Sequence, residues 1–176
     1  GPDIRAVVVT DFEKTSATSV VEDVLNKDAG GAIAAFRSLL ENESTDRLNP
    51  VLMTGSTVLV DDDLIKNILP KFEDWVNVRR LDIGFEIADN LGFKEIKSKG
   101  GHWKPRYYTE MITEMFQQGL TKCLVGTRGL LGEGWDASKI NVLIDLTTVT
   151  TSMSINQLRG RSFRLDKDNP NKVANN

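Results

Sequence analysis

Short apolar runs alternate with longer segments of helical periodicity along this chain, and that alternation restricts its fold more than any other feature. The apolar runs lie at residues 6–9, 51–53, 122–125 and 141–146. Apolar residues at helical spacing follow the first run, as in Ile33, Phe36 and Leu40, and recur over residues 64–69 and 105–118. Strands separated by helices favour an α/β fold, a three-layer sandwich with a mainly parallel central sheet.

Turn and cap residues predict where several helices begin and end. One of the aspartates at residues 61–63 is expected to cap the helix that follows, and Pro70 to mark the end of that helix. Pro105 suits the first turn of a helix that Gly119 would end. The weak pattern between these helices indicates a strand at residues 78–83 and a short helix at residues 86–91 that stops at Gly92.

Composition excludes several classes of function. The chain of 176 residues has one cysteine, Cys123, and one histidine, His102, so neither an internal disulfide nor a Cys- or His-based metal site is expected. There is no apolar stretch near the roughly 20 residues of a membrane span and no secretory leader, so the expected location is the cytoplasm. The net charge of −3 is unlike that of a basic nucleic-acid-coating protein, although basic residues cluster at residues 94–106 and 159–167.

Ligands of parallel sheets bind beyond the carboxyl ends of the strands. This rule selects the loop of Thr54, Gly55 and Ser56, the segment from residue 126 to residue 136, and the loop after Leu146. The second of these reads GTRGLLGEGWD and has four glycines in its first nine residues, together with hydroxyl, guanidinium and carboxylate groups. Glycine allows a backbone to approach a ligand closely, but the same pattern is also compatible with a tight turn.

A second polar motif, QLRGRSFR, begins 21 residues after Asp136. Gln157, Arg161 and Arg164 stand four and three residues apart, so on a helix they share one face. Arginine suits phosphate groups because its planar fork donates paired hydrogen bonds and keeps its charge. The alternative interpretation is a charged, solvated helix end.

Together, the two motifs resemble motifs V and VI of superfamily 2 helicases. VGTRGLLGEGWD looks like motif V, and QLRGRSFR fits the motif VI form Q-x-x-G-R-x-x-R at every fixed position. The resemblance is specific over residues 121–166, roughly a quarter of the chain, and looser upstream, where VLMTGST is similar to the motif IV strand. It implies a C-terminal RecA-like domain over residues 3–166, followed by a polar tail or linker at residues 167–176.

The resemblance also implies roles toward ATP and Mg²⁺. Gly134 and Asp136 would lie beside the ATP, with Asp136 accepting a hydrogen bond from a ribose hydroxyl. Gln157 would line the cleft between two motor domains, and Arg161 and Arg164 would reach the γ-phosphate as arginine fingers. Such fingers contribute roughly 10³ to 10⁵ in rate. The residues implied in nucleic-acid binding are Thr54, Gly55, Ser56, Gly126, Thr127 and Arg128.

The motifs of the first motor domain do not occur in this sequence. It contains neither a P-loop, G-x-x-x-x-G-K-[ST], nor a D-E-x-H or D-E-x-D box. The expectation is therefore a fragment of a longer protein, inactive alone, whose partners are nucleic acid (DNA favoured over RNA) and the N-terminal RecA-like domain that holds most of the Mg²⁺.

Two other classes of function were compared with this one. One alternative is a non-catalytic RecA-like module that binds nucleic acid or protein, against which the arginine pair argues. A Rossmann-type enzyme fails for want of G-x-G-x-x-G after the first strand. The basic and aromatic residues at 94–108 suit single-stranded nucleic acid. The favoured interpretation is instead a solvated loop that leads into a helix whose tyrosines pack inward.

Overall fold

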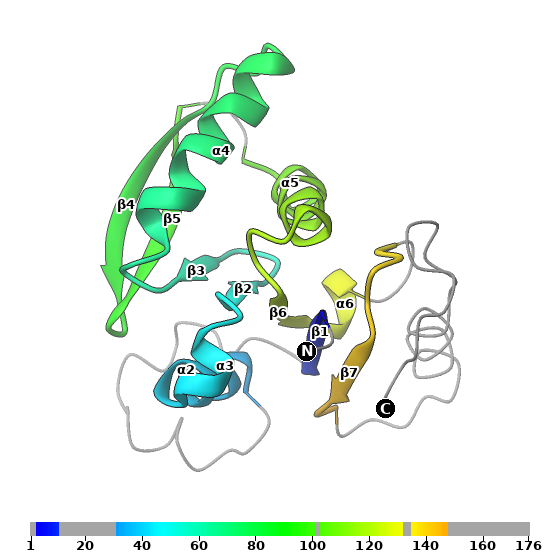
Figure 1. The fold of residues 1–176 in the computed structure, drawn as a ribbon. Coiled ribbons are helices and arrows are strands. Elements are labelled where there is room, and N and C mark those ends of the chain that lie inside the picture. The colour runs from blue at the N-terminus through cyan, green and yellow to red at the C-terminus, as the bar shows by residue number, and fades with distance from the viewer. Residues whose placement is uncertain (1–2, 11–30, 101–102, 132–134, 148–176) are drawn as a thin grey trace.

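The computed structural model describes residues 3–10, 31–100, 103–131 and 135–147, and Figure 1 shows their arrangement. The elements are β1 (Ala6–Thr10), α2 (Ala32–Glu41), α3 (Glu43–Asp46), β2 (Val51–Met53), β3 (Val58–Val60), α4 (Ile65–Val78), β4 (Gly84–Asn90), β5 (Phe93–Lys99), α5 (Pro105–Gln118), β6 (Cys123–Thr127), α6 (Arg128–Leu131) and β7 (Val142–Asp145). None of the helices in these ranges is long and apolar enough to cross a membrane.

All seven described strands form one sheet, in the order β4-β5-β3-β2-β6-β1-β7. The pairings of β2 with β6, of β6 with β1 and of β1 with β7 are parallel. The pairings of β3 with β2, of β5 with β3 and of β4 with β5 are antiparallel. The sheet is therefore mixed, and the prediction of a mainly parallel sheet is wrong for its β3-β5-β4 half. Two of these pairings, β2 with β3 and β4 with β5, join consecutive strands as hairpins, and a hairpin joins only antiparallel strands.

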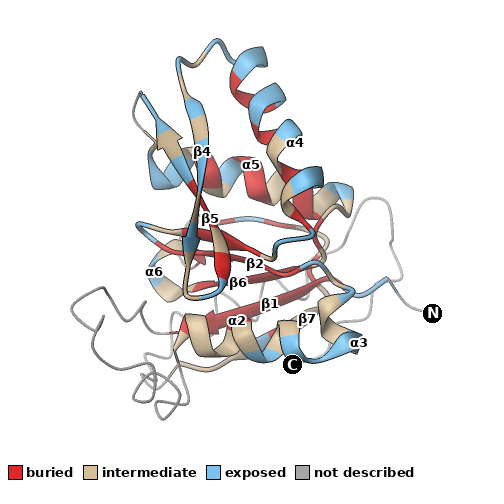
Figure 2. Ribbon diagram, turned by 90° about the vertical axis from the view of Figure 1, so that its left-hand side faces the viewer, coloured by how far each residue is buried: buried red, intermediate tan, exposed pale blue. Residues whose placement is uncertain are grey.

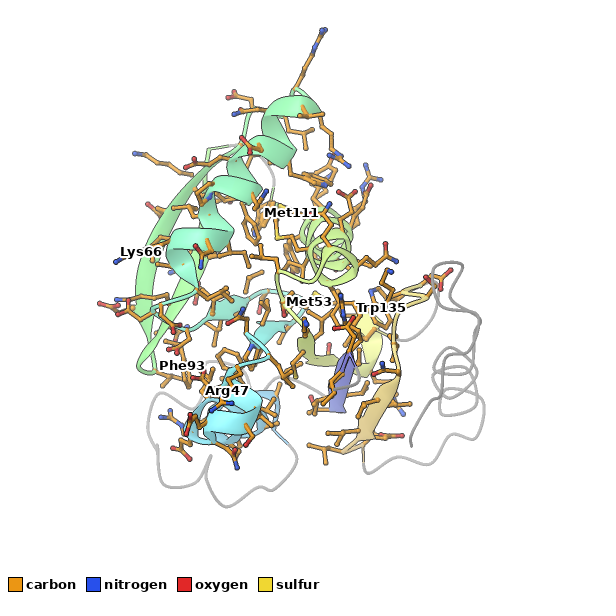
Figure 3. All side chains as sticks on the ribbon, in the orientation of Figure 1. Arg47, Met53, Lys66, Phe93, Met111 and Trp135 are labelled. Atoms are coloured by element: carbon orange, nitrogen blue, oxygen red, sulfur yellow. The ribbon has the colours of Figure 1, made fainter. Side chains whose placement is uncertain are left out.

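Helices cover both faces of the sheet, as the three-layer prediction requires. On one face, α4 and α5 pack on the strands, and their apolar side chains form a large core with Val7, Met53 and Leu124. On the other face, Phe36 of α2 packs with Leu52 and other strand residues. Figure 2 shows the buried residues concentrated on the strands and on the inner sides of the helices. In Figure 3, Met53 and Met111 lie in the core between β2 and α5.

Long-range packing overrides three of the local predictions. Pro70 does not end a helix but lies inside α4. Pro70 is exposed, whereas Phe72 and Trp75 in the next turns are buried. The packing of these two side chains in the core stabilises the helix beyond the position where proline favours a break. The side chains of residues 61–63 make no helix cap either: the N-cap residue is Leu64, without a side-chain cap.

The third wrong prediction concerns the region between α4 and α5. Residues 78–83 form no strand, and residues 86–91 lie mostly in β4 instead of a helix. Leu91 and Gly92 both have positive φ, 53° and 84°, the backbone geometry of a two-residue hairpin turn. Pairing with β5 across this turn decides the conformation of the segment. Gly92 therefore belongs to the hairpin and is not a helix stop.

α5 begins and ends where the sequence predicts. Pro105 is in its first turn, and Gly119 ends it in the left-handed conformation, with φ of 88°. The guanidinium of Arg5, a residue just before β1, donates to the carbonyl of Phe116 and to that of Gln117 at 3.4 Å. The end of α5 is thus held against the start of β1.

Candidate functional site

The carboxyl ends of the four parallel strands meet at one edge of the sheet. In the strand register Met53 lies opposite Gly126, Thr10 lies opposite Thr127, and Val9 lies opposite Asp145. The loop after β2 and the segment after β6 are therefore neighbours, although some 70 residues separate them in the chain. Two of the three places that the sequence singled out are brought together in this way, and the end of β7 lies two strands further along.

The loop of Thr54, Gly55 and Ser56 is a tight hairpin turn between β2 and β3. The Thr54 amide donates to the Thr57 carbonyl at 2.9 Å, and the Thr54 hydroxyl accepts from the amides of Ser56 and Thr57 at 3.3 and 3.1 Å. Thr54 is fully buried, whereas Gly55 and Ser56 are exposed. Thr54 thus shapes the turn, and any ligand contact of this loop falls to Gly55 and Ser56.

The glycine-rich segment begins as a strand and not as a loop. β6 extends to Thr127, and residues 128–131 form the single turn α6. Gly126 is buried in β6, where Leu131 packs against it. Thr127 and Arg128 are half-buried, and Gly129 is exposed with open space beside it. The requirement for glycine at position 126 therefore comes from packing, while Thr127, Arg128 and Gly129 are the accessible part of the segment.

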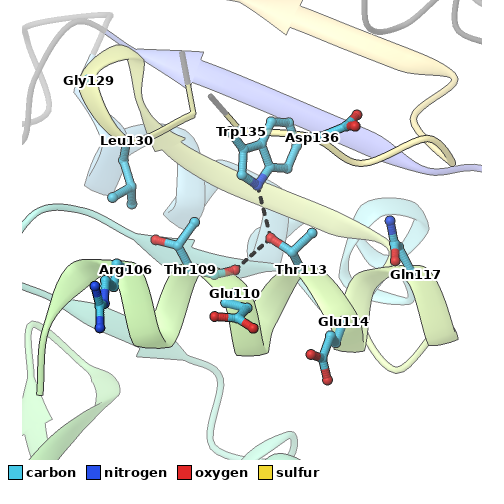
Figure 4. Close-up of a pocket in the computed structure, with 10 residues that line it drawn as sticks. All are labelled: Arg106, Thr109, Glu110, Thr113, Glu114, Gln117, Gly129, Leu130, Trp135 and Asp136. Atoms are coloured by element: carbon cyan, nitrogen blue, oxygen red, sulfur yellow. Dashed lines mark hydrogen bonds between the residues drawn. The ribbon is translucent and has the colours of Figure 1, made fainter. Parts of the chain in front are cut away.

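A groove of about 530 Å³ separates α5 from the segment that leads to Asp136. Figure 4 shows Trp135 across the groove from α5, where its Nε1 donates to the Thr113 hydroxyl at 2.9 Å. That hydroxyl donates in turn to the Thr109 carbonyl at 2.6 Å. The groove is lined by Arg106, Thr109, Glu110, Thr113, Glu114, Gln117, Gly129, Leu130, Trp135 and Asp136.

Asp136 is exposed, and in Figure 4 its carboxylate points away from α5. The residues proposed for nucleic acid lie at the strand ends, whereas Asp136 follows Trp135, which contacts α5 through Thr113. Gly134, the other predicted nucleotide contact, is outside the described residues.

The predicted catalytic residues Gln157, Arg161 and Arg164 also lie outside the described residues, and so does His102. In the described ranges, no group of three or more His, Cys, Asp or Glu side chains is placed to hold a metal ion.

The aromatic residues of the basic stretch pack inward. The Trp103 ring lies 5.3 Å from the ring of Tyr108 and 5.0 Å from that of Phe85, measured between centroids. Tyr108 is buried, and its hydroxyl donates to the Thr54 carbonyl. The interpretation that the tyrosines pack inward is therefore right for Tyr108, and Trp103 packs inward beside it. The exposed cations of this stretch are Lys97, Lys99, Lys104 and Arg106, of which Arg106 also lines the groove.

Thr10 is a site residue that the sequence analysis did not single out. It ends β1, which lies between β6 and β7, the point where the order of the parallel strands reverses. Ligands of open α/β sheets bind outside such points. Thr10 is fully buried, and its hydroxyl has no hydrogen-bond partner in the described part of the chain. The strand-end rule applied to residues 6–9 would have found it.

Comparisons with known proteins add no family assignment. No protein-family model, no curated protein and no solved structure matches the chain.

Proposed function

We propose that this chain is the C-terminal RecA-like motor domain of an ATP-dependent superfamily 2 helicase or translocase. The observation that carries the proposal is the meeting of the Gly55–Ser56 turn with Thr127 and Arg128 at one edge of the sheet. These groups offer backbone amides, hydroxyls and one guanidinium, which suit the phosphates of a nucleic-acid strand. We favour DNA over RNA.

The strand order supports the RecA-like part of the proposal. β1 lies between two strands that come much later in the chain. On one side is β6, which follows α5, and on the other side is β7, which follows α6. Ligands of open α/β sheets bind outside such a reversal of strand order, which supports a binding role for the neighbouring segment that resembles motif V. Asp136 would accept from a ribose hydroxyl, and Arg161 and Arg164 would neutralise charge on the γ-phosphate of ATP.

In this proposal, catalysis needs the two domains together. The N-terminal RecA-like domain of the parent protein would hold the phosphates and most of the Mg²⁺, and this chain would supply the arginine fingers. ATP binding would close the cleft between the domains, and hydrolysis would open it again, which moves the strand along the edge. The proposed location is the cytoplasm.

ATP hydrolysis by the longer parent protein, with and without DNA or RNA, tests this proposal. The double variant Arg161→Ala, Arg164→Ala should lose at least about a hundredfold in rate while it remains folded. The matched control is Arg47→Ala. Arg47 is exposed at the end of α3, and among the described contacts its side chain pairs only with Glu43. This variant should retain the parent rate.

The polymer that stimulates hydrolysis identifies the track. A parent protein that never hydrolyses ATP, or a double variant as active as the parent, would show that the arginines are not fingers. A non-catalytic module for nucleic acid or protein would then be the better description.

A further inference from the structure

α5 contacts both halves of the candidate site through side-chain hydrogen bonds. Near its start, the Tyr108 hydroxyl donates to the Thr54 carbonyl in the turn after β2. Further along, the Thr113 hydroxyl accepts from Trp135, the residue before Asp136. One helix thus joins the proposed nucleic-acid turn to the proposed nucleotide residue.

The geometry of each contact is specific. Tyr108 is 2% exposed, and its hydrogen bond to the Thr54 carbonyl is buried, whereas the bond from Trp135 to the half-buried Thr113 hydroxyl is partly buried beside the groove. The Thr113 hydroxyl has a single hydrogen atom, which it donates to the Thr109 carbonyl. Its lone pairs therefore face the indole, and the orientation of Trp135 is set by the backbone of α5.

α5 itself is held along its length. The buried residues Tyr108, Met111, Ile112, Met115 and Phe116 anchor it on the sheet. Arg5 holds its last turn through the Phe116 and Gln117 carbonyls. A rigid helix in a close-packed core transmits strain along its length, so α5 is suited to link the contacts at its two ends.

We propose that Tyr108 and Thr113 are positioning residues through which α5 couples the Thr54–Ser56 turn to Asp136. A nucleic-acid strand that orders the turn shifts α5 and with it Trp135 and the adjacent carboxylate. The inference rests on the proposed function, because it takes that turn as the contact for nucleic acid.

The test uses this chain labelled with 5-fluorotryptophan, titrated with a single-stranded oligothymidylate and observed by fluorine NMR. A Trp135→Phe variant assigns the Trp135 resonance among the three tryptophans. In the unaltered chain, saturating oligonucleotide should move the Trp135 resonance. Tyr108→Phe removes the hydroxyl and keeps the ring, and it should reduce this shift by about half or more while the oligonucleotide still binds.

Thr113 offers a matched pair of variants. Thr113→Val removes the acceptor for Trp135 and should abolish most of the shift, whereas Thr113→Ser keeps the hydroxyl and should retain the shift. A purely structural role would make both variants alike once each is folded, which circular dichroism checks. Hydrogen exchange of the Trp135 indole N–H, which donates to the Thr113 hydroxyl, should be faster in Thr113→Val than in Thr113→Ser.

The outcomes separate the two proposals. A Trp135 shift of full size in Tyr108→Phe or in Thr113→Val means that the signal travels through β6 and α6, and the role of α5 is overturned. A bound oligonucleotide that leaves the Trp135 resonance unmoved overturns it as well, with nucleic-acid binding intact. A chain that binds no oligonucleotide, DNA or RNA, overturns the proposed nucleic-acid contact and this inference with it.

Discussion

The side chain of Leu131 occupies the space that a Cβ atom on Gly126 would need. An added Cβ would lie 2.6 Å from Leu131 Cδ1 and 3.1 Å from the Met53 carbonyl oxygen. Leu131 is fully buried, so it has no open space into which to move. The contact packs α6 against β6, and it explains a glycine in the middle of an apolar strand.

Gly126→Ala should therefore destabilise the chain by about 1–3 kcal/mol, the usual cost of overpacking a core. Urea unfolding followed by circular dichroism measures the loss. Gly129→Ala is the matched control, because no atom lies within 4 Å of the position of its Cβ. In that helical turn alanine should be neutral or stabilise by up to about 1 kcal/mol. Equal effects of the two substitutions would contradict this account of Gly126.

Arg5 stabilises the last turn of α5 from the start of β1. Its side chain is 9% exposed, and its guanidinium donates to the Phe116 and Gln117 carbonyls at the negative end of the helix dipole. Arg5→Met keeps much of the apolar stem but leaves these carbonyls without their charged donor. The expected loss is about 2 kcal/mol in the free energy of unfolding. Arg47→Met, at an exposed ion pair with Glu43, should change it by less than about 0.5 kcal/mol.

Asp3 makes the stability of the chain depend on pH at the acid end. A hydrogen bond from Lys122 at 2.8 Å, and then the charge of Arg5, lower the pKa of Asp3 below its ordinary value of 3.8. A carboxyl with a lowered folded-state pKa contributes stability above its unfolded pKa, and this contribution is lost as the pH falls through the folded value.

Asp3→Asn should thus cost about 0.5 kcal/mol at neutral pH, because the pair is partly exposed. The difference from the parent chain should shrink as the pH falls below 3.8. Urea unfolding of both chains over this range measures it. A difference that stays constant with pH would mean that the carboxylate charge has no role.

Cys123 should not react in the folded chain. It is fully buried at the start of β6, and burial raises the pKa of its thiol to about 12. Since the thiolate is the reactive species, a thiol reagent such as DTNB at mildly alkaline pH should modify it only after unfolding. The rate in urea, compared with that in buffer, checks this. Rapid modification of the native chain would contradict the burial of β6 at its first residue.

Local patterns in the sequence predicted the elements that bury a continuous apolar stripe. β1, β2, β6, β7 and α5 appear where periodicity and caps place them, because strand length, β-branching, a first-turn proline and a terminal glycine act over a few residues. The region of α4 and the β4-β5 hairpin was misread. There the helix passes through Pro70, and β4 has alternating exposure without a strong apolar run.

The sequence predicted which residues belong to the candidate site but did not predict how they are arranged or what they contact. Thr54 was named as a contact, yet its hydroxyl is used inside its own turn. Gly126 was named as well, yet its role is to admit Leu131. Thr10 follows the apolar run at residues 6–9 and was not singled out, and only the strand pairing shows that it lies beside Thr127.

What the sequence determined by itself is the set of strands and helices in the parallel half of the sheet, and the two segments that resemble helicase motifs. Only the tertiary structure decided which strands pair, that three of them join in antiparallel fashion, and that α5 lies between the Thr54 turn and Trp135. The physical reason is range. Periodicity and capping are properties of neighbouring residues, whereas strand pairing and the contacts of Tyr108 and Thr113 depend on burial among residues distant in the chain.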